Sequence, residues 1–203
     1  MRAAAATPAG RGREVALACA VALAYYLAAR LGLALAFEGS NASPVWPPSG
    51  IAFAALWLWG RRVLPGVALG ALVANVVVFS ANQAAEPGVI AAVSLAIMAG
   101  NAAEALVGVA ALRRWTDAGS PFERLGDVAK FVLVAAGACL VSAAVGTASL
   151  VLGGIVPGSL SATVALTWWT GDATGLLVVA PLLMTAWRAA AVPAPAPLGG
   201  AAL

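Results

Sequence analysis

Val45-Trp46-Pro47-Pro48-Ser49-Gly50-Ile51 is the stretch of sequence that decides the fold. Pro47 and Pro48 fix φ and have no N–H donors, so a helix can begin here but cannot extend back through them. Only eleven residues separate Pro48 from Gly60, whereas a membrane crossing needs about 20 apolar residues. A full crossing must therefore include residues 45–48 as an extended or broken segment. Irregular backbone at that depth needs protein or a wet cavity around it, so we expect this segment to face the interior of a bundle.

The composition indicates an integral membrane protein with no metal or cofactor chemistry. Of the 203 residues, 63% are hydrophobic and 9% charged, and the mean hydropathy is +0.97, whereas a soluble domain is about 25% charged. The basic residues lie between hydrophobic runs rather than on one face, which argues against a nucleic-acid partner. Histidine is absent, and Cys19 and Cys139 lie in apolar runs, so we expect buried thiols and no metal site.

Six hydrophobic segments predict an all-α fold, a polytopic transmembrane helix bundle over residues 15–188. The expected spans are 15–37, from 45 to the Arg61-Arg62 pair, 63–81, 89–112, 128–152 and 160–187. Residues 1–14 are expected to form a disordered cytoplasmic lead. Residues 189–203, rich in Pro, Ala and Gly, are expected to form a linker-like tail.

The distribution of basic residues orients the bundle. With six spans and both termini in the cytoplasm, every Lys and Arg except Arg30 falls in the lead, in a cytoplasmic turn or at the cytoplasmic end of a span. Lys and Arg accumulate on the cytoplasmic side of membrane proteins, so both the number of spans and the orientation are supported.

Three charged residues lie inside predicted spans: Arg30, Glu104 and Asp172. Each costs about 2.5–3.5 kcal/mol at mid-bilayer and should turn inward to a partner. The helical rise places Arg30 and Asp172 at ~22 Å above the cytoplasmic edge but Glu104 at only ~12 Å. We therefore expect an Arg30–Asp172 ion pair, with Glu104 deeper in the membrane. Whether that pair serves function or only locks the first span to the sixth stays open.

The sixth span carries the densest cluster of polar and aromatic residues, Trp168-Trp169-Thr170-Gly171-Asp172. Trp168 and Asp172 share a helix face, and an acid beneath an aromatic lid suits a small cationic or polar ligand. An interfacial tryptophan belt is the alternative. Asn101 and Glu104 in the fourth span, like Asn75 in the third, are either part of the same centre or polar contacts between helices. The candidate ligand-sensing or structural polar core comprises Arg30, Trp46, Pro47, Pro48, Asn75, Asn101, Glu104, Trp168, Trp169 and Asp172.

An ordered series of motifs resembles the membrane-associated sensor family of type one (MASE1). The motifs are Trp46-Pro47-Pro48-Ser49-Gly50-Ile51-Ala52, Trp59-Gly60-Arg61-Arg62-Val63-Leu64-Pro65-Gly66-Val67, Gly70-Ala71-Leu72-Val73-Ala74-Asn75, Gly100-Asn101-Ala102-Ala103-Glu104-Ala105-Leu106 with Leu112-Arg113-Arg114, and Trp168-Trp169-Thr170-Gly171-Asp172 with Gly175 and Ala180-Pro181-Leu182. The series covers roughly residues 15–188. The resemblance implies a sensory input domain of the bacterial inner membrane, whose partner is a cytoplasmic output of the histidine kinase or cyclic-di-GMP type and whose stimulus is an unknown small ligand. Because no output module follows Arg188, we expect a sensor without its output.

Two other classes of protein share features with this sequence. A six-helix substrate-binding component of a vitamin or micronutrient transporter has this size and span count, and would meet its membrane partner through Ala16, Ala20, Ala24 and Ala28 on the first span. An intramembrane enzyme is disfavoured, because histidine is absent, the only lysine is cytoplasmic, and the two buried acids are expected at different depths. We therefore predict no catalytic residues.

Overall fold

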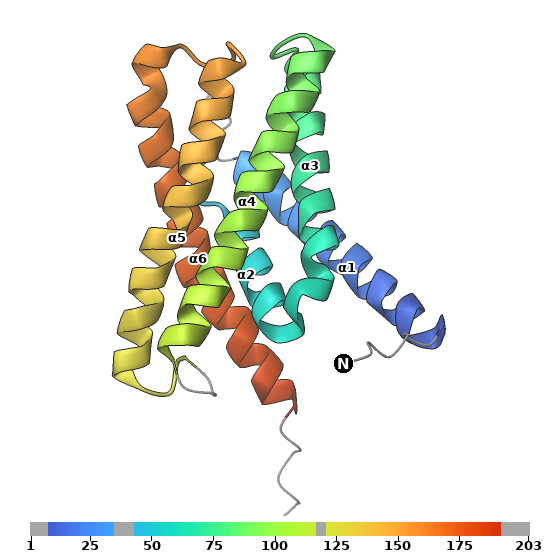
Figure 1. Cartoon of the computed structure of the whole chain (residues 1–203), viewed down its shortest axis with the longest axis vertical. Coiled ribbons are helices and arrows are strands. Elements are labelled where there is room, and N and C mark those ends of the chain that lie inside the picture. Colours follow the sequence, from blue (N-terminus) through green and yellow to red (C-terminus); the bar gives the residue numbers. More distant parts are fainter. Residues whose placement is uncertain (1–7, 35–42, 117–120, 192–203) are drawn as a thin grey trace, which may run out of the picture.

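The computed structural model describes residues 8–34, 43–116 and 121–191. In these residues every regular element is a helix (Figure 1). The elements are α1 (Pro8–Leu33), α2 (Pro47–Trp59), the 3₁₀ turn η1 (Gly60–Val63), α3 (Leu64–Ala81), α4 (Pro87–Trp115), α5 (Leu125–Leu152), the 3₁₀ turn η2 (Gly158–Leu160) and α6 (Ser161–Ala191). The predicted all-α bundle is confirmed.

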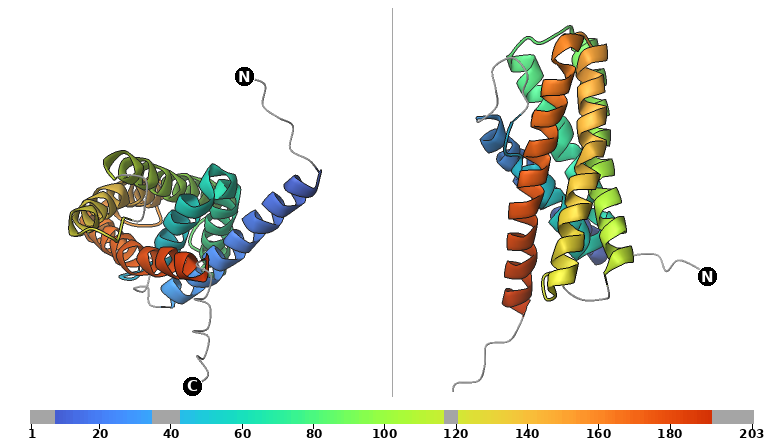
Figure 2. Two further views of the ribbon diagram at one scale, coloured as in Figure 1. Left: turned by 90° about the horizontal axis from the view of Figure 1, so that it is seen from below. Right: turned by 90° about the vertical axis from the view of Figure 1, so that its left-hand side faces the viewer.

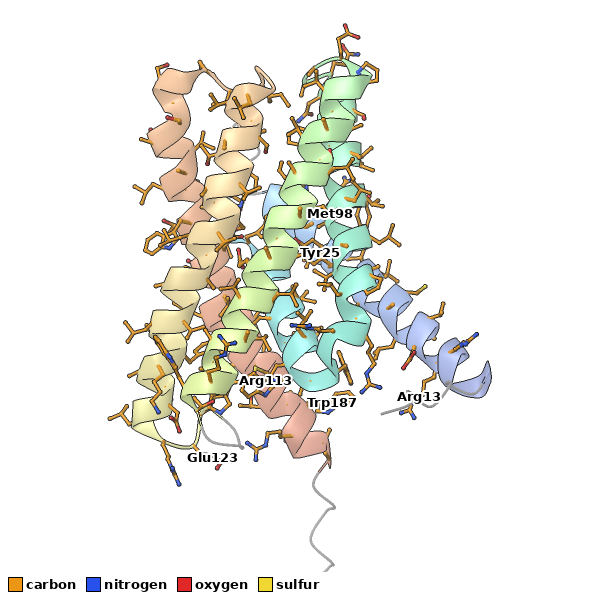
Figure 3. All side chains as sticks on the ribbon, in the orientation of Figure 1. Arg13, Tyr25, Met98, Arg113, Glu123 and Trp187 are labelled. Atoms are coloured by element: carbon orange, nitrogen blue, oxygen red, sulfur yellow. The ribbon has the colours of Figure 1, made fainter. Side chains whose placement is uncertain are left out.

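Five continuous helical stretches are long and apolar enough to cross a membrane, with α2, η1 and α3 counted as one stretch of 35 residues. Large apolar side chains such as Leu31, Leu133 and Leu182 cover the outside of the bundle. The start of α1 and the end of α6 lie at the same end of the bundle (Figure 1). Arg13 and Arg113 lie at that end as well (Figure 3), and the distribution of basic residues predicts that this is the cytoplasmic end.

The second predicted span is a half-helix preceded by partly buried irregular backbone, as the two prolines require. Pro47 and Pro48 occupy the first turn of α2, where a missing N–H costs no hydrogen bond. Its 13 residues extend only about 20 Å. The helix ends at Gly60, whose φ of +72° is a left-handed conformation that glycine adopts readily. Arg113 Nη2 and Arg62 Nε donate hydrogen bonds to the carbonyls of Trp57 and Trp59 at that end.

Helix α1 begins seven residues before the expected start of the first span, because Pro8 is favoured in a first helical turn. The helix is strongly tilted, and its lower end points away from the other helices (Figure 2). Its outward face also carries Cys19, which is exposed, so the prediction of a buried thiol was wrong at this position. Cys139, by contrast, is buried in α5.

The long helices form an open arc around the short α2. Along the arc α1 packs on α3, α3 on α4, α4 on α5 and α5 on α6, and α2 contacts α1, α4 and α6. The α1–α3 contact uses Gly66 and Gly70, which lie one helical turn apart on α3. A Cβ on Gly70 would come within 2.8 Å of the Ala22 carbonyl oxygen, and one on Gly66 would be closer still to that of Ala18. Small residues allow this close approach inside a membrane.

A buried acidic centre between α2, α4 and α6

The segment before α2 lies against the glycine face of α6. The backbone N–H of Trp46 donates a hydrogen bond of 2.9 Å to the carbonyl of Gly171. A Cβ on Gly171 would collide with the carbonyl oxygen of Ser43, and one on Gly175 with that of Trp46. The two glycines thus leave room for a non-helical chain in the centre of the bundle. The sequence predicted that this segment faces the interior of the bundle.

Asp172 is the anchor of this centre. Its side chain has no exposed area, and two serine hydroxyls donate to its carboxylate. Ser49 Oγ on α2 donates to Oδ1 at 2.9 Å, and Ser142 Oγ on α5 donates to Oδ2. One carboxylate therefore ties the half-helix α2 and helix α5 to α6.

Glu104 brings a second carboxyl group into the same place. It is 1% exposed and lies within hydrogen-bonding reach of Asp172, Ser49, Ser142 and Cys139. Its Oε2 atom is buried and receives no hydrogen bond from any donor in the described part of the chain. Two carboxyl groups thus meet in the interior of the bundle.

The predicted difference in depth between Glu104 and Asp172 was wrong. The depths were estimated from the rise per residue, on the assumption that all helices are upright and end at the same level of the membrane. Helix α6 instead is inclined and extends below the other helices at the cytoplasmic end (Figure 1). The incline lowers Asp172.

The predicted ion pair between Arg30 and Asp172 was also wrong. The buried stripe of α1 follows helical spacing through Val21, Tyr25, Ala28 and Ala29, and a step of 100° per residue turns Arg30 off this stripe. Arg30 is accordingly exposed on α1. It does not contribute to the acidic centre.

A hydrogen-bonded group adjoins the two acids from the side of α1. The hydroxyl of Tyr25, which is 1% exposed, accepts a hydrogen bond of 3.0 Å from Asn101 Nδ2 and lies within reach of the Trp46 side chain. Asn101 Oδ1 is buried and has no partner among the described residues. Asn101 therefore connects α4 to α1 and keeps one free acceptor.

A small cavity lies on the outer side of the acids. The space open to the centre of a water-sized sphere is about 20 Å³, which is room for at least one water molecule. Ile97 and Trp168 in its wall precede Glu104 and Asp172 on helices that run inward from the outer end. The wall consists of Leu33, Ser43, Trp46, Asn75, Ile97, Asn101, Trp168 and Asp172.

Some of the remaining predicted site residues line the cavity, and the others pack in the core or begin α2. Trp168 lines the cavity and packs on Gly146 of α5, where a Cβ would lie 2.6 Å from the indole. Trp169 points elsewhere, because its Nε1 donates a hydrogen bond to the Ala136 carbonyl and its ring packs on the hydrophobic core. Asn75 lines the cavity while its Nδ2 is bonded to the Ala71 carbonyl of its own helix. Pro47 and Pro48 start α2 and so position Ser49.

Sequence reasoning missed four members of the centre: Tyr25, Ser49, Ser142 and Cys139. Ser49 lies in the diproline motif but offered no partner by itself. Tyr25 lies on the inward stripe of α1, which could have indicated it. A single serine or cysteine in an apolar span, as in α5, gives no signal, because such residues commonly serve helix packing.

The fold and this centre define a polytopic helical membrane domain with acids, hydroxyls and tryptophans around a small polar cavity. The MASE1 family model matches residues 17–196. The chain therefore belongs to the MASE1 family of integral membrane sensory domains, and the predicted resemblance is confirmed. No curated protein and no solved structure matches the chain.

Proposed function

We propose that this domain is the input part of a bacterial inner-membrane signalling protein, which receives its stimulus at the acidic centre and passes it to a cytoplasmic histidine kinase or cyclic-di-GMP output. The family is one of sensory rather than catalytic domains, so the proposal assigns no reaction to Glu104 and Asp172. The outer-side cavity between Trp46, Trp168 and Asp172 is the place where a small ligand or ion from the periplasm would act.

The observation that carries the proposal is that both ends of α2 lie on α6. At the centre, Ser49 and Trp46 are hydrogen-bonded to Asp172 and Gly171. At the cytoplasmic end, the rings of Trp59 and Trp187 pack edge to face with centroids 5.0 Å apart. A change at the centre that moves α2 relative to α6 would therefore reach the segment that leaves the membrane.

The test is a fusion of the chain to a diguanylate cyclase domain, screened over pH, ionic composition and osmolarity. Asp172→Asn is expected to abolish every response that the wild-type fusion shows, because the amide cannot accept both serine hydroxyls in the same way. Glu86→Gln, an exposed acid at the outer start of α4, is the matched control and should respond like wild type. An unchanged response in the Asp172→Asn fusion, at equal membrane abundance, contradicts the proposal.

One specific observation supports the alternative that the chain is a substrate-binding component of a transporter. Ala20 and Ala24 of α1 line an apolar groove of about 370 Å³ toward α2 and α6, although Ala28 is buried in the bundle. The family match favours the sensor. Genes for an ATPase pair and a transmembrane coupling protein beside this one would favour the transporter instead.

A further inference from the structure

The two carboxyl groups at the centre share an enclosed site with no basic side chain in the described residues placed to neutralise them. Glu104 and Asp172 are 1% and 0% exposed and lie within hydrogen-bonding reach of each other. Arg30 is on the outer surface of α1, and the other described basic residues lie at the cytoplasmic ends of the helices. Two ionised carboxylates in contact repel each other, the more so in an apolar interior. The site therefore requires a positive charge between its oxygens.

We propose that the Glu104–Asp172 pair is a binding site for protons from the outer side, and that the proton is the stimulus received by this domain. The inference rests on the function proposed above. In the resting state that we infer, Glu104 carries one proton and donates it to the Asp172 carboxylate, which also accepts hydrogen bonds from Ser49 and Ser142. A second proton, released by water or hydronium in the cavity, binds Asp172 and changes the charge of the pair from −1 to 0.

Two buried oxygens that receive no hydrogen bond from a described donor support this assignment, and the second of them lies outside the acid pair. Glu104 Oε2 is buried without a described donor, which suits an oxygen that itself carries the proton. Asn101 Oδ1 is a second buried acceptor without a described partner, and its residue lines the cavity. Because residues three apart share a helix face, Asn101 is suited to accept from a water molecule or hydronium close to Glu104.

The small cavity provides a route for protons from the outer side to Asp172. It lies between the acids and the outer end of the bundle, touches Asp172 directly and has room for water. Both oxygens of Asp172 already accept hydrogen bonds from the hydroxyls of Ser49 and Ser142. The described residues also contain no group of three or more metal-ligating acids, histidines or cysteines. These contacts favour the proton over sodium.

Uptake of the second proton would weaken the bond between α2 and α6. A neutral Asp172 accepts more weakly from Ser49 than a carboxylate does, so the start of α2 is released. The other titratable groups that face the pair are Tyr25 on α1 and Cys139 on α5. From α2 and α3 only the neutral Ser49 and Asn75 reach the centre or its cavity.

The test measures proton binding directly, by infrared difference spectroscopy of the purified full chain in lipid nanodiscs between acidic and alkaline pH. We expect a carbonyl band of a protonated carboxyl group that titrates with pH. The band should be lost in Asp172→Asn, which removes the acid that takes up the second proton. In Glu104→Gln, which keeps Asp172, the band should titrate at a different pH, and in Glu86→Gln it should be unchanged. A wild-type spectrum without a titrating band that depends on these two residues would overturn the inference, whatever the fusion reports.

A second variant protects the test against misfolding. Ser142→Ala keeps both acids but removes one donor to the Asp172 carboxylate, so the midpoint of the band should move to higher pH by about one unit. An unmoved midpoint contradicts the geometry on which the inference depends. Replacing choline by sodium at constant pH should leave the band unchanged, and a band that follows sodium would assign the site to that ion. If Asp172→Asn loses the fusion response but the wild type shows no titrating band, the sensor proposal stands and only the proton is excluded as the stimulus.

Discussion

The hydroxyl of Tyr25 shows how much a single buried polar atom contributes to this bundle. It is the acceptor for Asn101 Nδ2, and the other amide atom of Asn101 already has no described partner. Tyr25→Phe removes that acceptor and should lower stability by about 1–3 kcal/mol, the cost of leaving a buried donor unpaired. The neighbouring Tyr26, which is only half-buried, provides the matched control Tyr26→Phe. Thermal unfolding in one detergent compares the two, and equal midpoints would contradict the assigned role.

At the scale of elements, the contact between the segment 43–46 and α6 depends on the absence of two side chains. Gly175→Ala would push a methyl group into the carbonyl of Trp46, and such overpacking typically costs about 1–3 kcal/mol. Gly137→Ala is the control, because nothing lies within 4 Å of its Cβ position and alanine favours a helix by about 1 kcal/mol. Unfolding midpoints should therefore move down for Gly175→Ala and up or not at all for Gly137→Ala. A tolerated Gly175→Ala would show that the segment does not pack there.

The cytoplasmic end of α6 offers a second comparison at this scale. Trp187 packs on Trp59 of α2, whereas Arg188 forms a salt bridge of 2.8 Å with Glu123 in which the side chains are 50% and 63% exposed. Exposed ion pairs contribute about 0–1 kcal/mol. If α2 and α6 relay the signal, Trp187→Ala should reduce the output response of the fusion several-fold while Arg188→Ala leaves it nearly unchanged. Trp115→Ala, an exposed tryptophan of α4 at the same end, controls for loss of an interfacial aromatic, and the reverse order would exclude this relay.

At the scale of the whole molecule, the sequence predicts what depends on local chemistry. Prolines and glycines set where α2 begins and ends, and scarce charge set the class of fold and the inward turn of Glu104 and Asp172. The contact between those two acids depends on the tilt of α6. That tilt cannot be predicted from the residues of α6 alone. The position of Arg30 could have been found from the buried stripe of α1, since the stripe passes through Tyr25 and not through residue 30.

The orientation of the bundle is the remaining prediction at this scale. In a background where Cys19 and Cys139 are replaced by alanine, Gln83→Cys and Ser159→Cys place single thiols in the two turns assigned to the outer side, both exposed. Glu123→Cys places one at the opposite end, beside α5 (Figure 3). The positive-inside distribution requires that a membrane-impermeant maleimide label the first two in intact spheroplasts and the third only after permeabilisation. The opposite pattern would turn the cavity toward the cytoplasm, and a proton from outside could then no longer reach Asp172 by the route assigned to it.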